Sequence, residues 1–372
     1  MRTSPHALAV CQPGMERALK SEMERLRPDL HPGFQRPGLV TFSATKKPFG
    51  VEDAPSAIFA RMWAASAGPC KTLEAVLATA RDVGATHLFC GPRDAGEGSP
   101  PAVGLAIAVE ASKWQARLEK HFTRGTPQRG DIVLDVLTAP EEPPFVGWHA
   151  HGPSRHEAPG GLFNYPEPDK APLRAWRKVV EGLRWSRAPV ARGELVLELG
   201  AAPGGGTRAF VEAGLRVIAV DPQPLDPEVA AMPGVTVFAR RIGDLKLTSL
   251  PPDVRWLAAD PAIPPEDVLG AIARLRPALP NLRGYLLTLK LNDEGVIRHL
   301  PQTFARLREL GATSVSARQL PANRKDIFVY APIASPSAGK RAKPVVAAGK
   351  TAKPAPARSA APERRSKVKP RS

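Results

Sequence analysis

A glycine-rich turn that directly follows an apolar strand is the feature that most constrains how this chain can fold. The stretch Leu195-Val-Leu-Glu-Leu-Gly-Ala-Ala-Pro-Gly-Gly-Gly206 predicts a strand over 194–199, a turn made by Pro203 and Gly204, and a helix that ends near Gly214. The free backbone N–H groups at the start of that helix favour an anionic group such as a carboxylate. The stretch therefore predicts a ligand-binding strand–turn–helix unit.

The residues around the turn support a nucleotide-like ligand. We expect Gly200 to let a ligand approach the backbone, and Gly205 to allow close packing where the helix begins. The next strand ends at Asp221, which lies 23 residues after Glu198, a spacing that suits an acid reaching ribose hydroxyls. The turn is not the GxGxxG fingerprint of dinucleotide enzymes, and a GxxxxGK[ST] P-loop is excluded. The alternative is a turn with no ligand, which the agreement of turn, helix and acid disfavours.

The second half of the chain alternates apolar strand patterns with helical ones. This alternation predicts an α/β fold with a seven-stranded, mostly parallel sheet that helices cover on both faces. Helices are predicted between the strands, notably over 205–213, 265–275 and 293–309. The strand patterns lie at 194–199, 215–220, 235–238, 254–259, 284–291, 313–317 and 326–331.

The first half predicts a separate α+β domain. Its patterns indicate helices near 15–26, 55–66, 72–83 and 111–122. Strands are expected at 7–11, 38–42, 103–109, 131–137 and 145–149. Because residues 152–172 are rich in Pro and Gly and read as a linker, we place the domain boundaries at 1–165 and 166–333.

The net charge of +16 is concentrated at the C-terminus. Residues 334–372 hold eleven Lys and Arg, one acidic residue and six Pro, and they lack Leu, Ile, Met, Phe, Tyr and Trp. We interpret them as a disordered basic tail that either raises non-specific affinity for nucleic acid or simply solubilises the protein. Three Cys without a CxxC, and no long apolar run, predict a cytoplasmic protein without membrane segments.

Two charged residues at strand ends are candidates for catalysis. Asp260 follows the apolar strand over 254–259, and Lys290 ends the strand over 285–290. A lysine there is costly unless it is paired; burial would depress its pKa and a neighbouring Asp would oppose that shift. The alternative is an ion pair that only fixes two strand ends. On helical spacing, Lys178 points away from the apolar stripe of its helix and is expected in solvent.

These residues carry a family resemblance. The GAAPGG turn resembles the S-adenosyl-L-methionine site of class I methyltransferases, and the C-terminal half resembles the FtsJ-type RNA ribose 2′-O-methyltransferases. From residue 7 to about 330, the chain resembles the bacterial large-subunit rRNA cytidine 2′-O-methyltransferase M family. The matching motifs are Val10-Cys-Gln-Pro-Gly-Met-Glu16, Ile58-Phe-Ala-Arg-Met-Trp63, Ala171-Pro-Leu-Arg174 with Lys178, Leu199-Gly-Ala-Ala-Pro-Gly-Gly205, Leu287-Thr-Leu-Lys-Leu291 and Ala317-Arg-Gln-Leu320.

The resemblance implies a fold, a cofactor and a partner. The fold would be a Rossmann-like class I methyltransferase domain preceded by a ferredoxin-like segment and a THUMP-like RNA-binding domain. Asp244 matches the acid near the cofactor's adenine only with a shifted register of its segment. The residues implied to bind S-adenosyl-L-methionine are Glu198, Gly200, Ala201, Ala202, Pro203, Gly204, Gly205, Asp221, Asp244 and Asp260.

The resemblance also implies a catalytic Lys-Asp-Lys-Glu tetrad. It falls on Lys178, Asp260, Lys290 and, in place of the Glu, Asp326, which is one methylene shorter. A ribose 2′-hydroxyl must lose its proton as the methyl bond forms. We expect Lys290 to accept or polarise that proton and Asp260 to tune Lys290. Lys178 and Asp326 would orient the hydroxyl and balance charge, without any metal.

The sequence thus predicts 2′-O-ribose methylation of RNA, with a cytidine of 23S rRNA or its precursor particle as substrate, by a monomer or weak dimer. One rival is a non-catalytic rRNA-binding or assembly factor that retains the fold. Another is a class I methyltransferase with a protein or small-molecule substrate. His149, His151 and His156 lack further zinc ligands at suitable spacing, and we expect them in a loop that contacts RNA or faces solvent.

Overall fold

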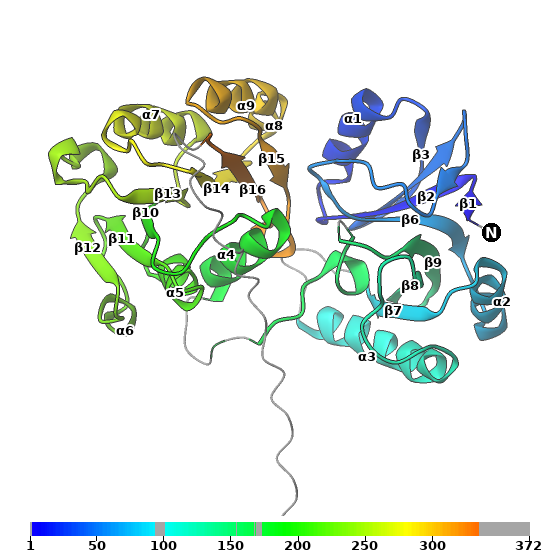
Figure 1. Cartoon of the computed structure of the whole chain (residues 1–372). Helices are drawn as coiled ribbons and strands as arrows, with labels where there is room; N and C mark the ends of the chain where they lie inside the picture. The colour runs from blue at the N-terminus through cyan, green and yellow to red at the C-terminus, as the bar shows by residue number, and fades with distance from the viewer. Residues whose placement is uncertain (1, 94–100, 154, 167, 169–172, 335–372) are drawn as a thin grey trace, which may run out of the picture.

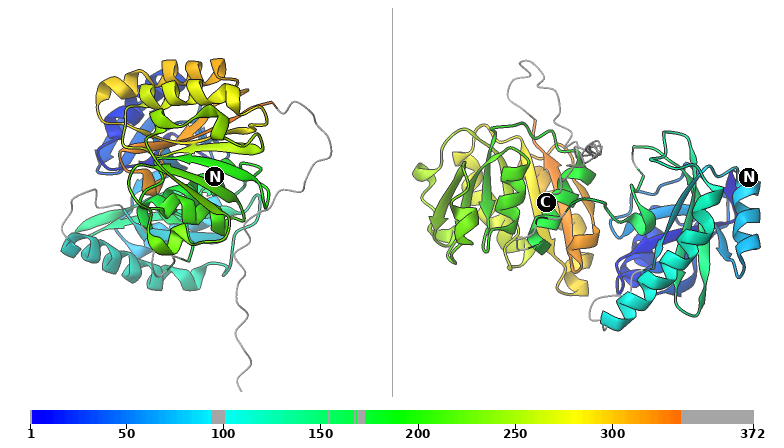
Figure 2. Two further views of the ribbon diagram at one scale, coloured as in Figure 1. Left: turned by 90° about the vertical axis from the view of Figure 1, so that its left-hand side faces the viewer. Right: turned by 90° about the horizontal axis from the view of Figure 1, so that it is seen from below.

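The computed structural model describes residues 2–93, 101–153, 155–166, 168 and 173–334, which form two β-sheets with helices packed on them (Figures 1 and 2). The predicted basic tail lies outside the described residues, apart from Ala334. None of the helices that the structure describes combines the length and the apolar character that a membrane crossing needs.

The first sheet contains seven strands in the order β3-β4-β2-β6-β9-β8-β7, of which β7 and β8 run parallel to each other. A two-stranded ladder, β1 (Thr3–Ser4) with β5 (Phe49–Gly50), lies beside it. The helices are α1 (Glu16–Leu26), α2 (Leu73–Val83) and α3 (Pro101–Leu118). The sheet strands are β2 (His6–Cys11), β3 (Leu30–Arg36), β4 (Leu39–Ala44), β6 (Ala60–Pro69), β7 (His87–Pro92), β8 (Ile132–Ala139) and β9 (Glu142–Ala150).

The second sheet is the predicted seven-stranded, mostly parallel one, in the order β12-β11-β10-β13-β14-β16-β15. β16 runs antiparallel to both of its neighbours. Its strands are β10 (Leu195–Leu199), β11 (Arg216–Asp221), β12 (Val235–Ala239), β13 (Val254–Ala259), β14 (Gly284–Lys290), β15 (Ser316–Arg318) and β16 (Asp326–Pro332). The helices are α4 (Leu173–Ser186), α5 (Gly205–Glu212), α6 (Pro227–Ala230), α7 (Pro265–Leu275), α8 (Glu294–Arg298) and α9 (Leu300–Glu309).

Helices cover both faces of the second sheet, which explains its apolar strands. Every residue of β10 is buried, and alternate residues face two different cores. Leu195, Leu197 and Leu199 pack in the core shared with α7 and α9, whereas Val196 packs in the core shared with α4, α5 and α6. Figure 1 shows the two helix layers above and below this sheet. Because a strand buried on both faces needs mostly apolar residues, the sequence shows nearly continuous apolar runs here, interrupted in β10 by Glu198.

Two elements predicted in the first half have a different structure, and the strands β3 and β7 were not predicted. The helix predicted over 55–66 is wrong, because residues 60–66 lie in β6, between β2 and β9 in the middle of the sheet. Its residues from Ala60 to Ser66 are all buried, so the alternation typical of a strand is missing. The strand predicted over 103–109 lies inside α3. There the buried residues Ile107, Ala111, Trp114 and Leu118 follow helical spacing, and Leu105 is 67% exposed.

The segment that connects the two sheets is fixed to the first sheet by a buried carboxylate. Asp135 on β8 accepts hydrogen bonds from His149 Nδ1 at 2.6 Å and from His156 Nε2 at 2.8 Å. All three side chains are buried, so the prediction that His149 and His156 face solvent or RNA is wrong. Two imidazoles against one buried carboxylate hold the pKa of Asp135 far below its usual range, although burial opposes this.

The same three residues bring metal-ligating atoms together. Their ligand atoms lie within 4.8 Å of one another. The oxygen–nitrogen distances of 2.6 and 2.8 Å are those of charge-assisted hydrogen bonds. The absence of a metal from the chemistry of this protein stays a prediction.

We expect Asp135→Asn to lower the free energy of unfolding by about 3–5 kcal/mol, because it removes the charge from a fully buried hydrogen-bonded group. Urea unfolding followed by circular dichroism measures this loss. Asp253→Asn is the matched control, since Asp253 forms an ion pair with Arg216 in which both side chains are about half exposed, and should change stability by less than about 1 kcal/mol. Equal effects of the two substitutions would contradict the assignment of Asp135 as a buried anchor.

Candidate functional site

The candidate site lies at the carboxyl ends of the strands of the second sheet, at the point where the strand order reverses. β10 pairs with β11 on one side and with β13 on the other, so the strand order reverses at β10. Ligands of open α/β sheets bind in the crevice outside the carboxyl ends of the strands at such a point. Gly200 follows β10 there, and Asp260 follows β13, with the Asp260 N–H donating to Leu199 O at 3.1 Å.

The glycine-rich turn has the left-handed backbone that its glycines allow. Gly204 has a φ of 111° and directly precedes α5. Gly200 has a φ of 77°, and a Cβ on it would lie 2.6 Å from Pro261 Cα. A side chain at Gly200 would therefore collide with the loop after β13. In the structure this glycine allows a close approach of the chain to itself, and the approach of a ligand to its backbone stays a prediction.

Glu198 lies beneath the turn and not in the crevice. Its carboxyl group is buried and accepts a hydrogen bond from Thr207 Oγ1 at 2.5 Å. A Cβ on Gly206 would lie 2.3 Å from Glu198 Oε1, so close packing at the helix start depends on Gly206. Burial, together with the smaller effect of the charges of Asp260 and Asp221, raises the pKa of Glu198 to about 8, although the hydrogen bond from Thr207 lowers it.

This pKa predicts a pH dependence of stability. Because the pKa of Glu198 lies at about 8 in the folded protein, above the ordinary value of 4.5, the folded state binds more protons than the unfolded state between those values. The free energy of unfolding should therefore fall as pH rises from 4.5 to 8, by up to about 1.4 kcal/mol per pH unit from this group. Glu198→Gln should remove this contribution and make the protein more stable at pH 9. Urea unfolding at pH 5, 7 and 9 without cofactor measures it.

The control for this experiment is Glu228→Gln, because Glu228 is exposed on α6. Its substitution should leave the pH profile of stability as it is in the wild type. A Glu198→Gln protein that loses stability with pH as the wild type does would show that Glu198 is ionised in the fold.

The two other predicted cofactor-binding acids lie on the same edge of the sheet. Asp221 ends β11, and its two carboxylate oxygens accept backbone hydrogen bonds from Ala202 at 3.1 Å and Gln223 at 2.8 Å. This holds Asp221 beside the turn, with lone pairs left for further donors. Asp244 is exposed and lies after β12 in a short 3₁₀ turn over Ile242–Asp244.

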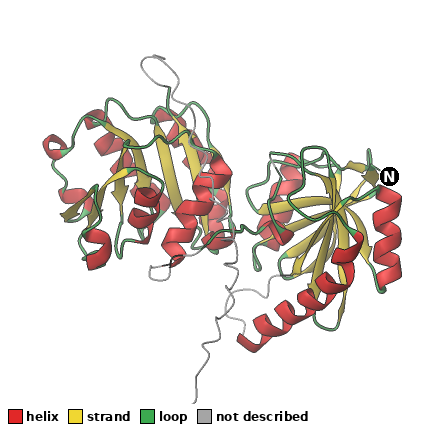
Figure 3. Ribbon diagram, turned by 60° about the horizontal axis from the view of Figure 1, so that its bottom comes forward, coloured by secondary structure: helices red, strands yellow, loops and turns green. Residues whose placement is uncertain are grey.

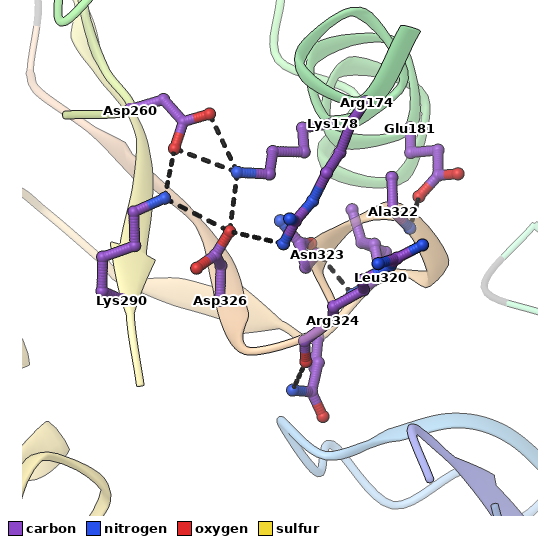
Figure 4. Close-up of polar contacts among 11 residues, drawn as sticks. Arg174, Lys178, Glu181, Asp260, Lys290, Leu320, Ala322, Asn323, Arg324 and Asp326 are labelled. Carbon is purple, nitrogen blue, oxygen red and sulfur yellow. Dashed lines mark hydrogen bonds and ion pairs between the residues drawn. The ribbon is translucent and has the colours of Figure 1, made fainter. Parts of the chain in front are cut away.

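The four predicted catalytic residues come together as one ion-pair network (Figure 4). Lys178 Nζ lies 3.0 Å from Asp260 Oδ2 and 2.6 Å from Asp326 Oδ2. Lys290 Nζ lies 2.9 Å from Asp260 Oδ1 and 3.4 Å from Asp326 Oδ2. Each carboxylate therefore bridges both lysines, and the two positive and two negative charges balance.

Different parts of the fold position the members of this network. Lys290 and Asp326 are directly opposite each other in the antiparallel pairing of β14 with β16. Lys178 extends from α4, which packs against β16. The register of one strand pair and the packing of one helix thus fix three of the four groups. Asp326 reaches both lysines although it is shorter than the Glu of the family pattern.

Exposure separates the network into two pairs. The side chains of Lys290 and Asp260 are 18% and 23% exposed, so a bound molecule can touch them. Those of Lys178 and Asp326 are only 6% and 4% exposed and lie behind them. The expectation from helical spacing that Lys178 lies in solvent is wrong. Its position opposite the apolar stripe of α4 is covered by the two carboxylates from β13 and β16.

The pKa of Lys290 shifts in the direction opposite to the one expected from burial. Burial lowers it, but the charges of Asp260 and Asp326 outweigh burial and raise the pKa above the ordinary lysine value. Lys290 is therefore an ammonium ion in the free protein. The effects of burial and of a neighbouring aspartate on this pKa were both expected, but which of them is larger depends on distances that only the folded structure gives.

Two residues near the network were not predicted as site residues, although Arg174 belongs to a motif that carries the family resemblance. Arg174, four residues before Lys178 on α4, places its guanidinium 3.9 Å from Asp326 Oδ2. Glu181, three residues after Lys178, accepts hydrogen bonds from Tyr165 Oη at 2.7 Å and from the Ala322 N–H at 2.8 Å. Glu181 thereby ties the segment that precedes β16 to α4.

Comparison with known proteins identifies the family. No family model matches the chain. Over 255 residues it is 31% identical to ribosomal RNA large subunit methyltransferase M of Halorhodospira halophila, and this alignment covers 62% of the chain and 71% of the relative. The chain belongs to the ribosomal RNA large subunit methyltransferase M family. The member from Alkalilimnicola ehrlichii is also 31% identical, over 158 residues that cover 39% of the chain and 42% of the relative.

Solved structures resemble the chain more distantly. A possible methylase from Clostridium difficile is 11% identical with a TM-score of 0.36, over 90% of this chain and 99% of that chain. The 1,6-didemethyltoxoflavin-N1-methyltransferase of Burkholderia thailandensis, solved with S-adenosylhomocysteine, is 22% identical with a TM-score of 0.34, over 43% and 79%. The strand order described above together with family membership confirms the predicted class I methyltransferase fold. The ferredoxin-like and THUMP-like descriptions of the first sheet stay predictions.

Proposed function

We propose that this protein transfers a methyl group from S-adenosyl-L-methionine to the 2′-hydroxyl of a ribose in large-subunit rRNA. The observation that carries the proposal is the network of two lysines and two aspartates beside the glycine-rich turn, at the strand ends where ligands bind. Membership of the methyltransferase M family supports both the reaction and the rRNA substrate. A cytidine of 23S rRNA as the methylated nucleotide is the finer form of the proposal.

The residues at the turn fit the cofactor. The backbone N–H groups at the start of α5, after the left-handed Gly204, suit the cofactor's carboxylate. Asp221 is oriented beside the turn and suits ribose hydroxyls, and Asp244 on the same edge suits the adenine side. When bound, the cofactor supplies a sulfonium-activated methyl group. Glu198 contributes indirectly, because its buried carboxyl group holds the start of α5 in place.

Lys290 and Asp260 would handle the reacting hydroxyl. Both are partly exposed at the crevice, and Lys290 Nζ is the charged group that a substrate hydroxyl can reach. The oxygen–methyl bond forms as the carbon–sulfur bond breaks, and the hydroxyl proton must leave. Since Lys290 is an ammonium ion in the free protein, it first releases its own proton to solvent and then receives the hydroxyl proton. Asp260 holds the lysine in line throughout.

Lys178 and Asp326 are positioning residues in this proposal. Both are buried behind the exposed pair, so they act through it and not on the substrate. Asp326 Oδ2 contacts both lysines and fixes the distance between them. Lys178 supplies the second positive charge, which keeps the two carboxylates compensated.

The test is methyl transfer from labelled S-adenosyl-L-methionine to unmodified rRNA, followed by mass spectrometry of rRNA fragments from cells with and without the gene. We expect one ribose methyl group to be lost without the gene. Binding of rRNA without transfer would favour the assembly-factor alternative, and transfer only to a protein or small molecule would favour the other rival. A methyl group on a base in place of the ribose would overturn the role given to Lys290.

A further inference from the structure

A cavity of about 320 Å³ lies between the two halves of the chain, away from the lysine–aspartate network. It is bounded by β6 of the first sheet, the connecting segment, the end of α4, and the strands β15 and β16; Figure 3 shows the connecting loops between the two halves. We call it the arginine pocket. Its charged and aromatic lining residues are Arg61, Arg155, His156, Glu157, Phe163, Arg184, Trp185, Arg187, Arg318 and Tyr330.

The arginine pocket carries an excess of positive charge. Five arginines line it against one carboxylate, and Glu157 already pairs with Arg184. Arg155 donates to the backbone carbonyl of Asp53 at 3.0 Å, and Arg187 donates to that of Pro153. Carbonyl oxygens satisfy hydrogen bonds but do not neutralise charge. The lining therefore has the composition of a site for an anion.

Arg318 has a buried hydrogen-bond donor that lacks an acceptor among the described residues. This donor is Nε, and the guanidinium of Arg318 lies over the Trp185 ring at 5.6 Å from the centroid. Burial lowers the pKa of Arg318, although the negative charge of Glu22 opposes this shift. A buried donor on a cation is costly when it is unsatisfied. A phosphate oxygen is a suitable acceptor, because phosphate accepts from the guanidinium fork in two parallel bonds.

The pocket also offers aromatic surface. Phe163, Trp185 and Tyr330 line it and are half-buried, so each exposes part of a ring. Arginines beside half-buried aromatic rings form the combination that binds single-stranded RNA, because bases stack on the rings while phosphates contact the cations. A peptide carboxylate would satisfy the charge but would leave the rings without a partner of matching shape.

The pocket lies within reach of the proposed reaction centre. Arg184 follows Lys178 by six residues on α4, which places it about 9 Å further along the helix axis. Tyr330 follows Asp326 by four residues on β16, about 13 Å along the strand. A strand of RNA with one ribose at Lys290 can therefore place a neighbouring nucleotide in the pocket.

We propose that the arginine pocket binds a nucleotide of single-stranded RNA a few positions from the ribose that is methylated, with its phosphate at Arg318 and its base against the aromatic rings. This inference rests on the proposed RNA methyl transfer. It assigns part of the substrate recognition to the junction between the halves of the chain. A site there would require the target strand to be unpaired over several nucleotides.

Arg318→Gln and Trp185→Ala test the proposal, with Arg308→Gln, on the exposed surface of α9, as the matched control. Each full-length variant is titrated with an unmodified 23S rRNA fragment by fluorescence anisotropy at several salt concentrations. Arg318→Gln should flatten the slope of log affinity against log salt by about 0.7, the value for one phosphate contact on a single strand. Trp185→Ala should weaken binding by roughly tenfold or more. The control should match the wild type, and cofactor affinity should be unchanged in all three variants.

A crosslinking measurement keeps the proposal testable if a variant folds poorly. Wild-type protein irradiated with a 4-thiouridine-substituted rRNA fragment should crosslink at Phe163, Trp185 or Tyr330. Crosslinks confined to other surfaces, or pocket variants with wild-type affinity and salt slope, would overturn the proposal. Competition by poly-glutamate but not by poly-uridylate would assign the pocket to an acidic protein partner. Methyl transfer by the wild type to the same fragment separates these outcomes, because its absence would count against the proposed function itself.

Discussion

Lys290→Met should reduce methyl transfer by about 10²–10⁴-fold, the contribution of a positioned acid–base group. Lys290 is the more exposed of the two network lysines. In the proposed reaction its Nζ contacts the substrate hydroxyl. Methionine keeps the length and apolar stem of the side chain but can neither hold nor receive a proton. The measurement is kcat/KM for transfer to unmodified rRNA, with cofactor affinity measured in parallel.

The fold should survive this substitution, because Lys178 still contacts both Asp260 and Asp326. Lys246→Met, an exposed lysine of the same half of the chain, is the control and should keep wild-type activity. Retained activity in the Lys290→Met protein would remove Lys290 from the mechanism. Loss of cofactor binding along with activity would assign it a structural role instead.

The raised pKa of Lys290 gives this prediction a pH signature. Asp260 and Asp326 overcome the effect of burial and keep Lys290 protonated in the free protein at neutral pH. If the neutral amine is the reacting form, its population rises tenfold with each pH unit below that pKa. We therefore expect log kcat/KM to rise with a slope near 1 from pH 6 to 9, without a plateau. A flat profile would show that Lys290 acts as an ammonium ion that only polarises the hydroxyl.

Asp326→Asn is expected to have the second large effect, on stability as well as on activity. Asp326 is buried, and Oδ2 lies 2.6 Å from Lys178 Nζ and 3.4 Å from Lys290 Nζ. Its neutralisation leaves two ammonium groups facing one partly exposed carboxylate. Removal of one partner from a buried ion pair lowers the free energy of unfolding by about 3–5 kcal/mol. Urea unfolding measures this loss, and kcat/KM for methyl transfer should fall with it.

Asp326→Glu tests whether the network needs the carboxylate charge at this position or the shorter side chain. The family pattern has Glu at this position, and the structure shows that the shorter Asp already contacts both lysines. We expect the Glu variant to retain most of the stability and activity, because it keeps the charge. Asp267→Asn, on the exposed surface of α7, is the control and should change neither quantity. If Asp326→Asn were as stable and active as that control, the network would not depend on its fourth member.

Local patterns predicted the elements that carry the site but not the contacts between them. The glycine-rich turn after β10, the acid that ends β11 and the charged residues after β13 and β14 were all identifiable. Each depends on a largely apolar strand and on residues next to it in the chain. The same kind of reasoning misassigned β6 and part of α3. β6 is buried over most of its length and so loses the periodicity that separates strand from helix. In α3 the exposed apolar residues Leu105 and Val109 obscure the helical spacing.

What the sequence by itself determined was therefore the order of strands and helices in the second half and the chemical groups at their ends. Only the tertiary structure decided that Lys178 is buried, that Lys290 is protonated and that Asp326 is long enough. Those properties depend on distances between groups that are 82 and 36 residues apart in the chain, as with Lys178 to Asp260 and Lys290 to Asp326. Coulomb interactions and burial depend on which groups are close in space. Hydrophobic periodicity depends only on neighbours within one helix or strand, so it does not indicate which distant groups come together.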